Sequence, residues 1–253
     1  IPHLALQVPD EYLEQYKGMW SETPYTGDRY LPHPTPKSAY AAMITFMDAQ
    51  VGRLLALLEE LDLDENTVVF FTSDNGTTTL SDQVDAEFFN SVGPLRGLKG
   101  SLHEGGIREP LVVWWPGKIE AGTSSTHQAA HYDMPATLAE IAGTSMTSNT
   151  DGISILPTLS GRDEDQETHE YLFWDFAGYG GQIAVRMGKW KGIKKDLRQD
   201  PEAPLELYDL EEDISEQNDV STEYPEIAER IEQIMLEART VPEVEAFRFG
   251  EYS

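Results

Sequence analysis

Residues 67–76 have the sequence TVVFFTSDNG, which is the clearest indication of the fold class in this chain. Its first six residues are β-branched or aromatic without interruption, which is typical of a strand buried on both faces, as in a parallel sheet. The strand stops abruptly at Ser73-Asp74-Asn75-Gly76. Ligands bind at the carboxyl ends of strands in open α/β sheets, so Asp74 and Asn75 are predicted to lie at a site.

Asp74 and Asn75 present a carboxylate and an amide oxygen side by side. Both are hard oxygen donors of the kind that Ca²⁺ and Mg²⁺ prefer. The alternative is a tight turn, because Asn-Gly is also a strong hairpin signal. A hairpin needs an alternating strand after the turn, and residues 77–85 do not supply one. The local sequence leaves both interpretations open.

Helices and strands on either side of this stretch indicate an α/β layer fold. A long helix is predicted from about Lys37 to Leu61, because its apolar residues recur at steps of three and four. A second buried strand is predicted over residues 111–115, and a helix over residues 133–142. Residues 77–106 show neither a helical nor a strand period, and a loop of this length is usually functional.

The composition changes over residues 143–170, which are rich in Ser, Thr and Gly and then acidic. We therefore predict two units, residues 1–160 as part of an α/β domain and residues 161–253 as a smaller α+β subdomain. The second unit is predicted to be an antiparallel sheet covered by an amphipathic helix over residues 225–239. Its strands are expected over residues 171–175, 182–187, 189–194 and 205–209.

Residues 95–110 form a glycine-rich segment with the sequence LRGLKGSLHEGGIREP. Glycines let a backbone approach a ligand closely, so Lys99 and His103 are candidates to face an anion. The alternative is an exposed loop with ordinary solvated basic residues. The whole chain has 18 basic and 45 acidic residues, and a basic cluster in so acidic a chain favours the anion site.

The composition argues against several classes of protein. A net charge of −27 argues against a nucleic-acid partner, which would need a basic face, and against docking on anionic lipid. The absence of cysteine excludes disulfides, zinc–thiolate sites and thiol nucleophiles within these 253 residues. The uninterrupted apolar runs are far too short for a bilayer, so no membrane span is expected.

Taken in order, these segments resemble the type I sulfatases of the alkaline-phosphatase superfamily. Pro2-His3 followed by Gln7-Val8-Pro9 looks like the family's Pro-His segment. Residues 67–76 look like its strand ending in Ser-Asp-Asn-Gly, and residues 99–110 like its Lys…Glu-Gly-Gly-x-Arg-x-Pro signature. The resemblance covers nearly the whole chain. It implies part of an alkaline-phosphatase-like layered sheet, with a small C-terminal antiparallel sheet plus helix.

The resemblance also implies a function and roles for particular residues. It implies hydrolysis of an organic sulfate ester, with sulfated carbohydrates among the candidate substrates. Asp74 and Asn75 match the pair that ligates the active-site calcium. Lys99 matches the lysine that contacts the sulfate, and His3 matches the histidine at the sulfate or leaving-group oxygen. His103 stands where the family often has an aromatic residue, and we expect it to contact substrate.

One part of the family's machinery is missing from this sequence. The family's nucleophile is a formylglycine made from the first residue of Cys/Ser-x-Pro-Ser/Ala-Arg, and no such motif is present. The chain therefore resembles the C-terminal half of the family, and the formylglycine is expected in an N-terminal half. Without that half, we expect the 253 residues to be inactive and prone to aggregate. By resemblance to exported bacterial enzymes, the expected location is periplasmic or secreted.

Two other functions stay open on the sequence. A phosphonate or phosphodiester hydrolase of the same superfamily would share the metal and the lysine and histidine. A non-catalytic remnant of a sulfatase fold would have lost its nucleophile. Comparing turnover of an aryl sulfate with turnover of an aryl phosphonate distinguishes a sulfatase from the phosphonate or phosphodiester hydrolase. A search for the nucleophile motif upstream of Ile1 distinguishes a sulfatase from the non-catalytic remnant.

Overall fold

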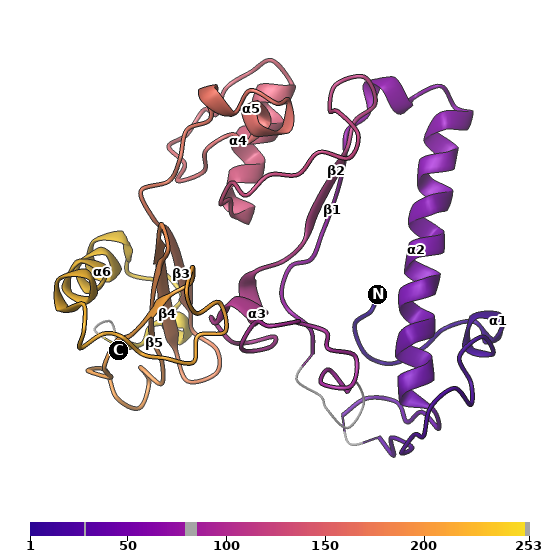
Figure 1. The fold of residues 1–253 in the computed structure, drawn as a ribbon, viewed down its shortest axis with the longest axis horizontal. Coiled ribbons are helices and arrows are strands. Elements are labelled where there is room, and N and C mark those ends of the chain that lie inside the picture. The colour runs from indigo at the N-terminus through magenta and orange to yellow at the C-terminus, as the bar shows by residue number, and fades with distance from the viewer. Residues whose placement is uncertain (28, 79–84, 251–253) are drawn as a thin grey trace.

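The computed structural model describes residues 1–27, 29–78 and 85–250. Figure 1 shows α2 and the N-terminal segment on one side, a two-stranded ribbon in the middle, and the C-terminal sheet with its helix on the other side. The helices are α1 (Asp10–Leu13), α2 (Pro36–Glu60), α3 (Glu104–Ile107), α4 (Met134–Ile141), α5 (Leu156–Leu159) and α6 (Pro225–Ala238). The strands are β1 (Val69–Thr72), β2 (Leu111–Trp114), β3 (Leu172–Phe176), β4 (Gln182–Met187), β5 (Trp190–Lys194) and β6 (Glu206–Asp209).

Helix α2 confirms the predicted long helix to within one residue at each end. It begins at Pro36, whose fixed φ and missing N–H suit the first turn of a helix. Its fully buried residues all lie near this end: Pro36, Ser38, Ala39, Ala42 and Met43. Further along, Leu54 is 63% exposed and Leu61 is 55% exposed. The predicted apolar stripe is therefore largely uncovered by the described part of the chain.

Helix α2 also bears on the expectation that the chain has no membrane span. Within the described ranges it is the one helix long and apolar enough to cross a membrane by length and composition. The uninterrupted apolar runs within this helix are short, because a few polar residues interrupt them. Those few residues lower the mean hydropathy of the helix only slightly. The core helix of a soluble protein passes the same test, so this finding is weak evidence for a span.

Strands β1 and β2 pair antiparallel, with Val69 opposite Trp114 and Thr72 opposite Leu111. The prediction of strands buried on both faces in a parallel arrangement is wrong for the described residues, since Val112 is 59% exposed and no residue of either strand is fully buried. An apolar run indicates that a strand has surface to bury, but it specifies neither the covering segment nor the direction of the neighbouring strand. Here the chain turns back on itself between the strands, which makes the pair antiparallel.

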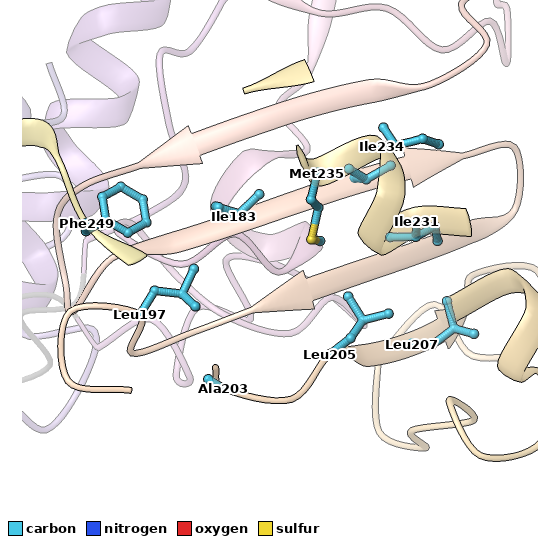
Figure 2. Packing of buried hydrophobic residues seen from close by; sticks show 10 residues of the cluster. Ile183, Leu197, Ala203, Leu205, Leu207, Ile231, Ile234, Met235 and Phe249 are labelled. Carbon is cyan, nitrogen blue, oxygen red and sulfur yellow. The ribbon is translucent and has the colours of Figure 1, made fainter. Parts of the chain in front are cut away.

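The C-terminal unit confirms the predicted antiparallel sheet with one covering helix. Its strands follow one another in chain order, β3-β4-β5-β6. Ile231, Ile234 and Met235 of α6 pack on one face of this sheet, against residues that include Ile183 and Leu207 (Figure 2). Ile231, Ile234 and Leu207 are fully buried. This apolar cluster is the largest core of the described chain.

The opposite face of the C-terminal sheet holds the glycine-rich segment. Leu102 of that segment is 5% exposed and packs in a second cluster with Ala184, Tyr208 and Leu210. Burial of one leucine side chain stabilises by about 1.5–3 kcal/mol, so this contact anchors the segment firmly. The predicted site residues Lys99 and His103 therefore lie between the loop after β1 and the C-terminal sheet.

Candidate functional site

The turn after β1 and the glycine-rich segment interlock through their backbones. The backbone N–H of Lys99 donates a hydrogen bond to the carbonyl oxygen of Thr77 (2.8 Å). A Cβ atom at Gly76 would overlap the carbonyl oxygen of Gly105, so only glycine permits this approach. The contact brings the loop that carries Asp74 against the turn that carries Lys99.

The glycine-rich segment is also folded tightly on itself. The backbone N–H of Gly105 donates to the carbonyl oxygen of Arg96 (2.7 Å), and a Cβ atom at Gly105 would overlap the carbonyl oxygen of Gly97. The sequence interpretation had these glycines approaching a ligand. In the structure they approach other backbone segments, which fixes the shape of the Lys99 turn.

Asp74 is exposed and Asn75 is half-buried at the carboxyl end of β1. Burial, and after it the negative charge of Asp74, raises the pKa of the nearby Glu109 carboxyl. A cation at this point would relieve the repulsion between the two carboxylates. The described residues contain no group of three or more His, Cys, Asp or Glu side chains that could hold a metal ion. Asp74 and Asn75 therefore fit a calcium ion as two hard ligands of an incomplete set.

A small open hollow of about 150 Å³ lies beside the interlocked loops. Gly76, Thr77, Arg108 and Glu109 are among the residues that line it. Neither Asp74 nor Lys99 lines this hollow. It is therefore a separate feature from the predicted anion site.

His3 lies exposed on the N-terminal segment. Its Nδ1 is 2.7 Å from the carbonyl oxygen of Leu4, and its ring makes an edge contact with Tyr30 at a centroid distance of 6.0 Å. Because a carbonyl oxygen only accepts, Nδ1 carries the proton in this bond. The hydrogen bond to Leu4 thus leaves Nε2 free of this contact.

The first turns of α2 bring the His3 segment towards the interlocked loops. Leu4 and Leu6 are buried against Ala39 and Met43 of this helix. Tyr40, the residue of α2 that follows Ala39, has its hydroxyl oxygen 3.5 Å from Oγ1 of Thr77, which lies in the loop after Asn75. One end of α2 thus contacts both segments that carry predicted site residues.

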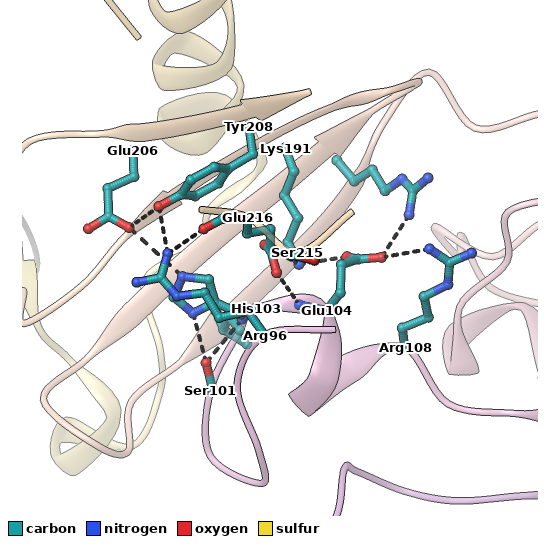
Figure 3. A network of polar contacts seen from close by, with 12 residues as sticks. Arg96, Ser101, His103, Glu104, Arg108, Lys191, Glu206, Tyr208, Ser215 and Glu216 are labelled. Carbon is teal, nitrogen blue, oxygen red and sulfur yellow. Dashed lines mark hydrogen bonds and ion pairs between the residues drawn. The ribbon is translucent and has the colours of Figure 1, made fainter. Parts of the chain in front are cut away.

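His103 points away from the solvent and towards the C-terminal sheet (Figure 3). It is 5% exposed, its Nδ1 is 2.9 Å from Oγ of Ser101, and its Nε2 is 3.8 Å from Oε2 of Glu206. Burial, together with the charge of Arg96, lowers the pKa of His103 to about 4. The ring is therefore neutral at pH 7, and its expected contact with substrate stays a prediction.

A buried ion cluster that the sequence interpretation missed fixes the start of α3 (Figure 3). Nζ of Lys191 lies 2.6 Å from Oε1 of Glu104 and 3.3 Å from Oε1 of Glu216. All three residues are at most 2% exposed. Arg186 binds the second carboxylate oxygen of Glu104 at 3.0 Å. The cluster joins the glycine-rich segment to β4, β5 and the loop after β6.

The pKa values of the two carboxyl groups in this cluster shift in opposite directions. Burial raises the pKa of the Glu104 carboxyl, but the charges of Lys191 and Arg186 outweigh burial and leave this pKa below its ordinary value. Burial dominates at Glu216 and raises its pKa in spite of Lys191. Arg108 also contacts Glu104 from four positions away, but Arg186 and Lys191 lie more than 80 residues away, so no local pattern indicated them. The one available signal was a lysine placed between Trp190 and Gly192 in an apolar strand.

The family model described as Sulfatase matches residues 2–144, which is more than half of the chain. The chain belongs to the sulfatase family. A second model, described as N-sulphoglucosamine sulphohydrolase, C-terminal, matches residues 98–241 of this sulfatase chain. These matches confirm the predicted family.

Named relatives agree with this assignment. The N-acetylgalactosamine-6-sulfatase of Canis lupus familiaris is 36% identical over 159 residues, which cover 61% of this chain and 28% of that protein. Arylsulfatase A of Bos taurus is 30% identical over 249 residues, which cover 87% of this chain and 47% of that protein. The sulfatase chain thus spans less than half the length of either relative.

A solved structure confirms the predicted fold class. The crystal structure of Ps i-CgsB in complex with k-i-k-neocarrahexaose matches with a TM-score of 0.73 and 28% identity. The match covers 94% of this chain and 48% of that chain. The roles of individual residues stay predictions, namely those of His3, Asp74, Asn75, Lys99 and His103.

The buried cluster predicts that replacing Lys191 lowers the melting temperature much more than replacing Lys17, although both lysines make ion pairs of equal length. Lys191→Met leaves Glu104 and Glu216 buried without their shared ammonium group, which costs about 3–5 kcal/mol and lowers the melting temperature by roughly 6–20 °C. The control is Lys17→Met. Nζ of Lys17 is also 2.6 Å from Oε1 of Glu14, but the two side chains are 54% and 62% exposed, so we expect little change. Equal melting temperatures for the two variants would contradict the role of the cluster.

The lowered pKa of His103 predicts a loss of stability in acid. The folded protein binds fewer protons than the unfolded chain between about pH 6.5 and about pH 4, so stability falls as the pH drops through this window. His103→Phe removes this contribution. Denaturant unfolding at pH 7 and pH 4.5 should show the variant gaining stability relative to the parent at the lower pH. His131→Phe, at an exposed position, is the control. If the free energy of unfolding of His103→Phe differs from that of the parent by the same amount at both pH values, the prediction is refuted.

Proposed function

We propose that the intact protein that contains this chain is a sulfuric ester hydrolase, which releases sulfate from an organic sulfate ester. The observation that carries the proposal is the backbone interlock between the turn after β1 and the glycine-rich segment. It holds the hard ligands Asp74 and Asn75 on one loop and the cation Lys99 on the adjoining loop. Membership of the sulfatase family supports the same conclusion.

Lys99 supplies a positive charge for the sulfate group. Its side chain is half-buried, and no acidic side chain in the described part of the chain forms an ion pair with its Nζ atom. A fixed ammonium group stabilises negative charge that develops on the ester and leaving-group oxygens as the S–O bond breaks. Lys99 is therefore the proposed contact to the scissile sulfate.

His3 is the proposed proton carrier for the leaving alcohol. Its Nδ1–H is engaged by the carbonyl oxygen of Leu4, which orients the ring and leaves Nε2 for exchange with the leaving oxygen. A histidine that carries a proton on Nε2 as well acts as a general acid when it delivers that proton to the leaving oxygen.

Asp74 and Asn75 are the proposed calcium ligands of this chain. A bound divalent ion supplies charge neutralisation at sulfate oxygens. The repulsion between Asp74 and Glu109 and the hard oxygen donors support a cation here. The other ligands and a formylglycine nucleophile are proposed to come from an N-terminal half.

The uncovered apolar surface supports the need for that half. Leu54 on α2 and Val112 on β2 are 63% and 59% exposed. Apolar surface of this kind is normally buried against another layer. We propose that the N-terminal half of the sulfatase domain covers it, and that the 253 residues alone do not turn over a sulfate ester.

A sulfated carbohydrate is the proposed substrate class. The relative from Canis lupus familiaris is named N-acetylgalactosamine-6-sulfatase, and the matched structure of Ps i-CgsB holds k-i-k-neocarrahexaose. Both names indicate a sugar.

Lys99→Ala in the intact enzyme tests the proposed role of the lysine. Loss of one fixed donor to a developing charge costs about 2.7–4 kcal/mol, so kcat for an aryl sulfate should fall by about a hundredfold or more. The exposed Lys118→Ala is the control and should leave kcat unchanged. A kcat near that of the parent in Lys99→Ala would rule out the role.

Asp74→Asn tests the proposed metal site. The substitution keeps the size and one oxygen of the side chain but removes its charge, so calcium affinity should fall by about tenfold or more. Isothermal titration of the metal-free enzyme with CaCl₂ measures this directly, with the exposed Asp151→Asn as control. An unchanged calcium affinity in Asp74→Asn would exclude Asp74 as a ligand.

A further inference from the structure

One side chain of the C-terminal sheet holds the turn that follows Lys99. Gln182 is the first residue of β4 and is 5% exposed. Its Nε2 donates a hydrogen bond to the carbonyl oxygen of Gly100 (2.8 Å), and its Oε1 accepts one from the backbone N–H of Leu102 (3.2 Å). We propose that Gln182 is a positioning residue for Lys99: it acts on the reaction through the lysine and does not touch the substrate.

The amide group suits this task chemically. A primary amide offers a donor and an acceptor side by side, so it pairs with a carbonyl and an N–H of the turn as a neighbouring strand would. A buried amide must be hydrogen-bonded, because an unmade bond in the interior leaves the full desolvation cost uncompensated. Alanine supplies neither bond, and glutamate supplies only the acceptor.

The turn is held from both of its sides. On one side, the N–H of Lys99 is bonded to Thr77 in the loop after β1. On the other side, Gln182 binds Gly100 and Leu102. Gly100 has φ +87°, and a Cβ atom there would lie 2.6 Å from the ring of Tyr179, so this point of the turn requires glycine. Loss of the Gln182 bonds releases the side that faces the C-terminal unit.

The expected consequence is a misplaced ammonium group. Displacement of a reacting or stabilising group by about 1 Å can cost about a hundredfold in rate. This inference rests on the proposed role of Lys99 and extends it to a residue 83 positions away, in the other unit of the chain.

The chain offers a matched control in Gln166. Its Oε1 accepts a hydrogen bond from the N–H of Thr158 (3.1 Å), and its Nε2 donates to the carbonyl oxygen of Ser154 (2.9 Å). Gln166 thus braces a loop backbone with the same two kinds of bond as Gln182, and its Nε2 also donates to the carbonyl oxygen of Glu167 (2.8 Å). It does so around α5, away from the Lys99 turn.

The test is a double-mutant cycle in the intact enzyme, with an aryl sulfate as the probe substrate. Gln182→Ala should lower kcat by about 10- to 100-fold. In a Lys99→Ala background the same change should lower kcat by less than about threefold, because the position of an absent ammonium group no longer matters. Gln166→Ala should leave kcat within about twofold of the parent.

The outcomes separate this inference from the proposed function. A large effect of Lys99→Ala with no effect of Gln182→Ala overturns the positioning role and leaves the role of Lys99 intact. An equal loss from Gln182→Ala in both backgrounds shows general damage to the fold and also overturns it. A parent-like kcat in Lys99→Ala overturns both proposals together.

A second variant keeps the test decisive if Gln182→Ala melts below the assay temperature. Gln182→Glu keeps the acceptor for the Leu102 N–H and loses only the donor to Gly100. In the same double-mutant cycle, Gln182→Glu should also lower kcat when Lys99 is present and lower it much less in the Lys99→Ala background. Hydrogen exchange of the peptide over residues 99–104 should be faster in both Gln182 variants and unchanged in Gln166→Ala.

Discussion

Backbone packs directly on backbone where Gly76 meets Gly105, and the rest of the candidate site depends on that contact. A side chain at Gly76 would push the two loops apart, and one at Gly105 would strike the carbonyl oxygen of Gly97 within the glycine-rich segment. With hydrogen at both positions, the N–H of Lys99 reaches the carbonyl oxygen of Thr77, and the acidic and basic halves of the site lie on adjoining loops. The glycines of a sulfatase signature thus act here on the protein itself, by permitting close approach of its own segments.

The C-terminal unit holds this arrangement with polar groups that are buried and paired. Lys191 lies between Glu104 and Glu216, while Gln182 brackets the turn after Lys99. Buried polar groups of this kind add little net stability compared with apolar packing, but they are costly to leave unpaired. That asymmetry makes them suited to specifying one geometry. The subdomain therefore serves as a template for the loop that carries Lys99.

The N-terminal part of the chain is built around surface that the described residues do not cover. Helix α2 is buried only at its first turns, where it contacts the His3 segment and, through Tyr40, the loop that carries Thr77. The ribbon of β1 and β2 has no fully buried residue. Both features agree with a chain that spans less than half the length of its named relatives. The same apolar character explains why α2 resembles a membrane helix in length and composition.

Local sequence signals were enough to predict the longer elements of this protein and its family. The bounds of α2, β4 and α6 follow from the apolar pattern of their residues to within one or two positions, because that signal is local. The ordered motifs identified the sulfatase family for the same reason. The folded chain was needed to show that β1 and β2 run antiparallel, that His103 faces Glu206, and that Lys191 and Gln182 bind the glycine-rich segment. These are pairings between residues tens of positions apart, and a side chain's local sequence specifies its chemistry but not its partner.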